Sequence, residues 1–153
     1  MQASAVAIAG RALLIEGPPG SGKSTLALAL IDRGAGLIGD DAVTLTPAAN
    51  GQLIAAAPPN IAGLLELRGI GLARLPVAKP TPVALILTLG GEPAERLPET
   101  IPRRTIAGVE VPMLSFDPGA IVPAARAEWA LVMHGLVFDP ASLCDASGQQ
   151  PPR

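Results

Sequence analysis

A glycine-rich decapeptide near the amino terminus carries residues whose spacing indicates chemistry. In residues 16–25, EGPPGSGKST, the positions Gly17, Gly22, Lys23 and Ser24 match the phosphate-binding pattern G-x-x-x-x-G-K-[ST]. Such glycines let backbone amides turn inward around phosphate oxygens, and a following helix adds its positive end. The lysine would reach the β- and γ-phosphates, and the serine hydroxyl would bind Mg²⁺. The residues expected at the nucleotide are Gly17, Pro18, Pro19, Gly20, Ser21, Gly22, Lys23, Ser24 and Thr25.

Three carboxylates are candidates for the remaining steps. Asp40 and Asp41 close the short apolar run GLIGDD, and in a parallel sheet beside the phosphate-loop strand they would face the phosphates. An acid there could hold Mg²⁺ through water or accept the proton of an attacking hydroxyl, and both interpretations stay open. Neighbouring strand residues point to opposite faces, so at most one of the pair can be the base directly. Glu66, beside Arg68 in LLELRGIGL, is either part of a charge pair at a surface helix end or a further Mg²⁺ ligand.

The apolar pattern predicts the elements that must position these groups. We expect two short strands around Gly10, a helix over residues 23–33 ended by Gly34, and a hairpin turn at Asn50 and Gly51. We also expect a short helix over residues 60–68, a buried strand over 82–90 and a surface loop over 90–105. A strand is expected over 109–116 and a helix over 122–136. Alternating strands and helices of this kind predict an α/β layer fold.

Composition excludes several classes of protein. The chain has 153 residues, a net charge of −2 and a single cysteine, Cys144, which suits one domain in a reducing compartment. No Lys/Arg cluster indicates a nucleic-acid surface, and no apolar run is long enough for a membrane span. We therefore expect a cytoplasmic domain over residues 1–140 and a disordered tail over 141–153.

The order of three motifs resembles the catalytic domain of the HPr kinase/phosphorylase family. These are GPPGSGKST, then RGAGLIGDD, then APPNIAGLLELRGIG, and the similarity is strongest over residues 12–75. The resemblance implies a P-loop kinase domain similar to that of phosphoenolpyruvate carboxykinases, with a central mixed sheet and flanking helices. It also implies ATP and Mg²⁺ as cofactors, a serine of the phosphocarrier protein HPr as the acceptor, and a homo-oligomer, hexameric in the family.

The resemblance further implies a role for each matching residue. Asp41 would be the base for phosphorylation, and Lys23 would act on the phosphates. The metal would be held by Ser24 and Glu66, with Asp40 beside them. Arg68 belongs to the family signature around the transferred phosphoryl group, and AERLP resembles a segment that carries a catalytic arginine, here Arg96.

Two departures from the family pattern bear on activity. The segment MQASAVAIAG has no histidine where family members often carry one, and Gln2 is its nearest polar candidate. SFDPGAIV lacks the arginine that the family ties to dephosphorylation, so the sequence favours the kinase reaction alone. Two alternatives stay open, a P-loop small-molecule kinase and a catalytically silent nucleotide-responsive binding module.

The remaining candidates have structural interpretations. His134 is expected at a helix end in a capping or surface role, and Trp129 with Met133 in the core or at a subunit contact. Arg103 and Arg104 are expected in a solvated loop.

Overall fold

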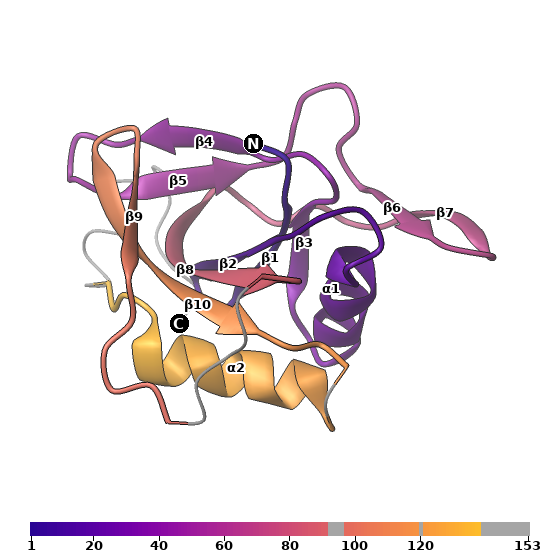
Figure 1. Ribbon diagram of the computed structural model, residues 1–153. Helices are drawn as coiled ribbons and strands as arrows, with labels where there is room; N and C mark the ends of the chain where they lie inside the picture. The colour runs from indigo at the N-terminus through magenta and orange to yellow at the C-terminus, as the bar shows by residue number, and fades with distance from the viewer. Residues whose placement is uncertain (92–96, 120, 139–153) are drawn as a thin grey trace.

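The computed structural model describes residues 1–91, 97–119 and 121–138. Within these ranges the chain forms two α-helices and ten β-strands (Figure 1). The helices are α1 (Lys23–Asp32) and α2 (Pro123–His134). The strands are β1 (Ser4–Ile8), β2 (Arg11–Glu16), β3 (Gly36–Gly39), β4 (Thr44–Pro47), β5 (Leu53–Ala56), β6 (Leu64–Leu67), β7 (Gly71–Arg74), β8 (Thr81–Leu89), β9 (Arg103–Ile106) and β10 (Val109–Phe116).

The main sheet is mixed and centred on β8. Its strand order is β3-β1-β2-β8-β10-β9, and β8 runs parallel to both β2 and β10. All but one of the nine residues of β8 are buried, because side chains from both faces of the central strand are covered. The continuous apolar run at 82–90 is therefore confirmed as a buried strand.

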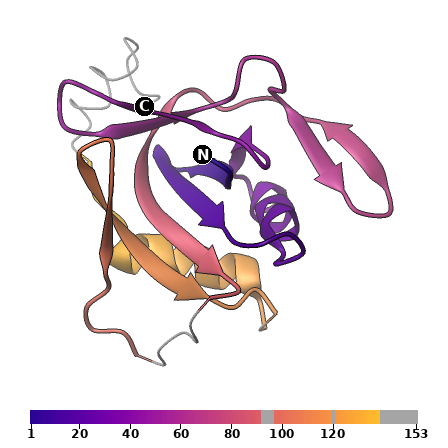
Figure 2. The ribbon, with the colours of Figure 1, turned by 45° about the horizontal axis from the view of Figure 1, so that its top comes forward.

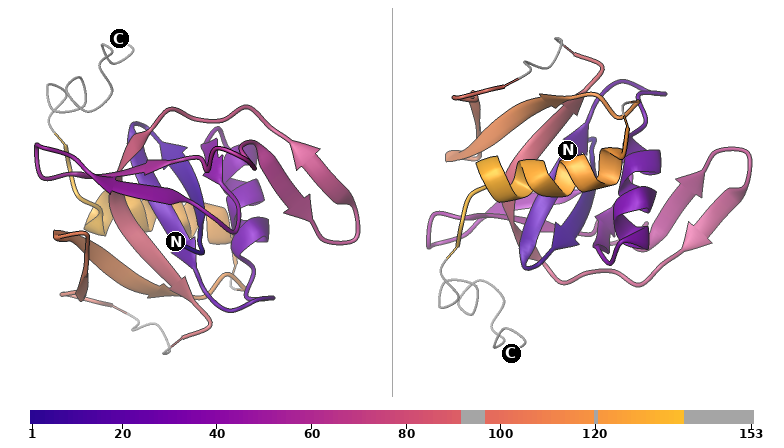
Figure 3. Two further views of the ribbon diagram at one scale, coloured as in Figure 1. Left: turned by 90° about the horizontal axis from the view of Figure 1, so that it is seen from above. Right: turned by 90° about the horizontal axis from the view of Figure 1, so that it is seen from below.

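Different elements cover the two faces of this sheet. Both helices lie on one face, where Leu26, Leu30 and Leu131 pack against Leu13 and Leu85 in one apolar core (Figure 3, right). The β4–β5 hairpin covers the other face, where its buried residues join a second core with β1, β2 and β8 (Figure 3, left). The expected α/β architecture with flanking helices is confirmed.

The strand that leads to Asp40 was expected directly beside the phosphate-loop strand, and it does not lie there. β1 lies between β3 and β2 and is antiparallel to both. β3 and β2 therefore run in the same direction, and their carboxyl ends still meet at one edge of the sheet. The neighbour was predicted wrongly because β1 pairs with both strands, but the shared edge that brings the acids to the loop is retained.

Residues 60–68 do not form the expected short helix. They lead into β6, which pairs with β7 as a separate two-stranded hairpin that projects from the body of the molecule (Figure 2). Gly63 and Gly69 adopt φ values of +83° and +79°, which helical residues do not. The leucines of LLELRGIGL fit either period, and the left-handed glycines decide in favour of the hairpin.

Helix α2 buries small residues and leaves large apolar ones exposed. Ala124, Ala127 and Leu131 face the sheet, whereas the side chains of Trp129 and Met133 are 65% and 71% exposed. A core role for these two residues is excluded because the alanine stripe makes the contact, and a subunit contact stays a prediction. His134 is the last residue of α2, as expected.

The structure leaves two of the expectations untested. The tail over 141–153 lies outside the described residues, as does Arg96. Among the residues that the structure describes, no helix is long and apolar enough to cross a membrane.

Candidate active site

The phosphate loop joins β2 to α1, and its shape depends on glycine. A Cβ atom on Gly17 would lie 2.8 Å from the carbonyl oxygen of Leu89, so a side chain there would collide with β8. Gly22 has a φ of +101° and serves as the N-cap of α1. These two positions let the chain leave the sheet edge and enter the helix at once.

The amino terminus of α1 is left open to an anion. Its N-cap residue makes no side-chain hydrogen bond, and its first turn contains no acidic residue. The first amides of a helix lack partners within the helix and carry its positive dipole end. An uncapped terminus behind a glycine loop fits a phosphate group.

Lys23 lies across the same loop. Its Nζ donates to the carbonyl oxygen of Gly17 at 2.7 Å and to that of Pro18 at 3.4 Å. The ammonium group is thus held by main-chain carbonyls at the mouth of the cradle, where a phosphate oxygen can replace them.

Asp40 connects three elements at the base of the site. Its Oδ1 accepts hydrogen bonds from Ser24 Oγ of α1 at 2.7 Å and from the buried Ser4 Oγ of β1 at 2.8 Å. Its Oδ2 accepts from the amide of Glu66 at 3.2 Å. Because the Ser24 hydroxyl donates its hydrogen bond to this carboxylate, a lone pair of the hydroxyl oxygen is free for a cation.

Asp41 turns away from this network and faces the cavity. Its φ is +62°, a left-handed conformation that aspartate tolerates better than most residues. The two acids therefore point in different directions because of this turn, and not because of strand alternation. The two carboxylates therefore lie in different surroundings, and the separate roles expected for them stay predictions.

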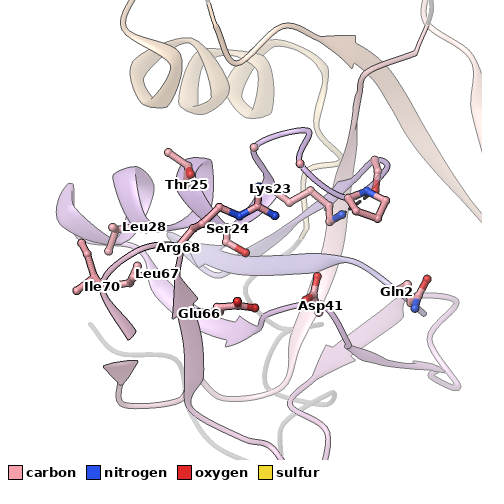
Figure 4. Close-up of a pocket in the computed structure, with 14 residues that line it drawn as sticks. Gln2, Lys23, Ser24, Thr25, Leu28, Asp41, Glu66, Leu67, Arg68 and Ile70 are labelled. Carbon is pink, nitrogen blue, oxygen red and sulfur yellow. Dashed lines mark hydrogen bonds between the residues drawn. The ribbon is translucent and has the colours of Figure 1, made fainter. Parts of the chain in front are cut away.

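A cavity of about 520 Å³ brings most of the expected residues together (Figure 4). Its volume is typical of small-molecule sites. Arg68 faces the loop across it, since a Cβ atom on Gly20 would lie 4.0 Å from Arg68 Nη1. The lining residues are Gln2, Gly17, Pro19, Gly20, Gly22, Lys23, Ser24, Thr25, Leu28, Asp41, Glu66, Leu67, Arg68 and Ile70.

Two residues of the expected phosphate set do not line the cavity. Pro18 and Ser21 lie against Gly90, whose built Cβ would be 3.2 Å from Pro18 Cδ and 3.8 Å from Ser21 Cβ. The Ser21 hydroxyl is buried without a hydrogen-bond partner among the described residues.

The oxygen donors fit magnesium better than a transition metal. The described part of the chain contains no group of three or more His, Cys, Asp or Glu side chains placed to hold a metal ion. Mg²⁺ needs only one or two protein oxygens beside phosphate and water. Ser24, supported by Asp40, and the exposed Glu66 at the cavity wall offer that set.

Some residues at the site carry no spacing signal in the sequence. Ser4 stands in an ordinary strand pattern, and only its burial against Asp40 reveals its part. Leu28 and Ile70 add an apolar end to the cavity. These contacts join segments that are distant along the chain.

An ion pair under the phosphate loop was also not expected. Arg104, predicted in a solvated loop, lies in β9 and donates through Nη1 to Oε2 of Glu16 at 2.6 Å and through Nη2 to Oε1. The hydrogen bonds to Glu16 raise the pKa of the Arg104 guanidinium above its ordinary value, against the opposing effect of burial. The Pro-rich segment before β9 therefore leads into a strand from which the side chain of Arg104 contacts the last residue of β2.

Comparison with known proteins shows a family whose matched region includes this site. The sequence model described as HPr Serine kinase C-terminal domain matches residues 1–119, which include every described residue named above at the cavity. The chain belongs to this family. The HPr kinase fold is shared with the HPr(Ser) kinase/phosphatase of Coxiella burnetii, at a TM-score of 0.77 and 30% identity over 88% of this chain and 94% of that one.

Curated members of the HPr kinase family match over a shorter stretch. The HPr kinase/phosphorylase of Bordetella petrii is 48% identical over 65 residues, and that of Brevibacillus brevis is 46% identical over 68. These matches cover 42% and 44% of this chain, and 21% and 22% of the two relatives. The matched part of the chain thus spans about a fifth of their length. The family resemblance inferred from the three motifs is confirmed.

Proposed function

We propose that this chain is an ATP-dependent kinase that phosphorylates a serine of the phosphocarrier protein HPr. The observation that carries the proposal is the pairing of Ser24 with Asp40 at the phosphate loop, with Asp41 facing the same cavity. Family membership supports the kinase, and the names of the relatives suggest the acceptor.

The phosphate loop and Lys23 would bind the nucleotide. Amides at the uncapped start of α1 would donate to phosphate oxygens, and Lys23 Nζ would exchange the carbonyl of Gly17 for the β- and γ-phosphates. Ser24, Asp40 and Glu66 would hold Mg²⁺, which when bound neutralises charge on the phosphates.

Asp41 would serve as the proton acceptor for the acceptor hydroxyl. The serine oxygen forms a bond to the γ-phosphorus while the bond to the β,γ-bridging oxygen breaks, and the serine proton passes to the carboxylate of Asp41. ADP leaves, and phosphoserine remains on the acceptor. Arg68, across the cavity from Gly20, would stabilise the negative charge of the group in transfer.

The loop that follows β10 favours the forward reaction. Pro118 packs on the phosphate loop, with its Cγ 3.4 Å from a Cβ built on Gly22, and Asp117 Oδ1 accepts the amide of Gly119 at 2.9 Å. Residues 117–119 therefore lie at the site but supply no arginine. We propose that the chain phosphorylates HPr and has little activity in the reverse direction.

One experiment separates the proposal from its alternatives. The chain is incubated with ATP, Mg²⁺ and HPr, and in parallel with ATP, Mg²⁺ and a set of metabolites. The intact mass of HPr is measured before peptide mapping, phosphorylated metabolites are assayed, and ATP binding is measured by calorimetry. A gain of one phosphoryl group on serine supports the proposal, with Lys23→Ala as the inactive control. Binding of ATP without transfer would indicate a silent nucleotide-binding module, and transfer to metabolites alone would indicate a small-molecule kinase.

A further inference from the structure

The residue directly before the phosphate loop carries a negative charge. Glu16 ends β2, and its α-carbon is about 3.8 Å from that of Gly17, the first glycine of the cradle. Its side chain is 15% exposed, so water screens the carboxylate only in part. A negative charge on the residue that enters the phosphate loop opposes the binding of a polyphosphate.

Arg104 compensates this charge from the far edge of the sheet. In the strand order β2-β8-β10-β9 its strand is three positions from that of Glu16, yet its guanidinium pairs with both carboxylate oxygens. Thr88 of β8 donates to Glu16 Oε1 at 3.3 Å, and Met113 Sδ of β10 lies 3.1 Å from Arg104 Nη2. The pair thus rests on the intervening strands, on the face of the sheet opposite the helices.

We propose that Arg104 sets the nucleotide affinity of the phosphate loop by neutralising Glu16. This inference rests on the proposed function, because it concerns the nucleotide of that site. Arg104 does not line the cavity, so it acts on the phosphates without contact, by cancelling the charge of Glu16. A pair that served only as a mechanical link between β9 and β2 would need both partners equally, whereas charge compensation gives the two partners opposite effects.

The test is a charge cycle at the two positions. The affinity for Mg²⁺-ATP is measured by isothermal titration calorimetry for wild type, Arg104→Gln, Glu16→Gln and the double variant. Arg104→Gln leaves the carboxylate uncompensated, and we expect its Kd to rise about five-fold. Glu16→Gln leaves a cation under the loop, so its Kd is expected to equal or fall below that of wild type. The double variant is expected within about two-fold of wild type.

Two controls separate charge from structure. Arg33→Gln removes the same charge from the Arg33–Glu128 pair at the opposite end of α1, and it should leave the Kd unchanged. The defect of Arg104→Gln should shrink between about 0.1 and about 1 M salt, because screening shortens from about 10 to about 3 Å. Thermal melts report the folding of each variant. If Arg104→Gln does not fold, Arg104→Lys takes its place in the test, and because it retains the charge it should bind Mg²⁺-ATP close to wild type.

The outcomes distinguish the inference from the function on which it rests. Equal losses in Arg104→Gln and Glu16→Gln, with no recovery in the double variant, would overturn charge compensation while the nucleotide site stands. A wild-type chain that binds no Mg²⁺-ATP would overturn the proposed function, and the inference with it.

Discussion

Ser24 of α1 and Ser4 of β1 donate their hydroxyl protons to the same oxygen, Oδ1 of Asp40, at 2.7 Å and 2.8 Å. One carboxylate therefore ties the helix that follows the phosphate loop to β1 of the main sheet. The second oxygen of Asp40 accepts the amide of Glu66, which brings the β6–β7 hairpin to the same point. The orientation of the expected metal ligand Ser24 is thus fixed by contacts that do not include the metal.

Replacement of Asp40 by asparagine should weaken magnesium binding. An asparagine that keeps its oxygen toward the Glu66 amide would turn its NH₂ group to Ser24, whose lone pair would then be used as an acceptor, and the negative charge near Ser24 would be lost. We expect the Mg²⁺ concentration at half-maximal activity to rise at least about ten-fold. Ser4→Ala is the matched control, since it removes one hydrogen bond worth about 1 kcal/mol but keeps the carboxylate beside Ser24. Similar Mg²⁺ requirements for the two variants would contradict this role.

Asp41→Asn should separate binding from transfer. The asparagine cannot accept the serine proton, so we expect a rate loss of about 10²- to 10⁴-fold with nucleotide affinity close to wild type. Lys23→Ala should lose both, because its ammonium lies over the phosphate cradle. Single-turnover transfer to HPr and calorimetric binding of ATP measure the two quantities. Wild-type transfer by Asp41→Asn would exclude Asp41 as the base.

Arg11 should stabilise the end of α2. Its Nη1 donates at 3.2 Å to the carbonyl oxygen of Leu131, in the last turn of α2, and at 3.3 Å to that of Leu136, just beyond the helix. The Leu131 oxygen also accepts the amide of Gly135, so the guanidinium adds a second hydrogen bond at the negative end of the helix. Arg11→Met should lower the free energy of unfolding in urea by about 1 to 3 kcal/mol. Arg11→Lys keeps a cation at the negative end of the helix and should lose less. A stability of Arg11→Met equal to wild type would show that water replaces the guanidinium without cost.

Val122 offers a stabilising substitution. This β-branched residue has a φ of +46°, a conformation that costs it on the order of 1 kcal/mol or more, and its side chain is largely exposed. Val122→Asn should therefore raise the free energy of unfolding by about 1 kcal/mol, since asparagine tolerates left-handed backbone. Val122→Ile, which keeps the strain, is expected to be neutral. Thermal unfolding compares the three chains, and equal midpoints would argue against strain at this position.

The parts of the site that lie close together in the sequence were predictable. The strand, glycine loop and helix over residues 11–32 follow local rules of spacing, backbone freedom and apolar period. The buried strand β8 was equally clear, because few elements other than a covered central strand place so many apolar residues in a row. Local physics decides these elements, so the sequence alone suffices.

Long-range pairings were not predictable in the same way. The insertion of β1 between β2 and β3 depends on hydrogen bonds between segments about thirty residues apart, for which no spacing rule exists. The contact between Glu16 and Arg104 joins positions 88 residues apart. The hairpin β6–β7 was missed because its leucines satisfy both the helical and the strand period. The exposure of Trp129 and Met133 on α2 was missed because alanines make the contact of that helix with the sheet.

The exposed Trp129 gives this chain an optical property of practical use. It is the single tryptophan of a sequence without tyrosine, so the near-ultraviolet emission of the protein comes from one position on the outer surface of α2. A side chain already in contact with water in the native state changes its emission little when the chain unfolds. Its fluorescence should instead shift to the blue when another molecule covers this helix, which makes it a built-in reporter of association at that surface.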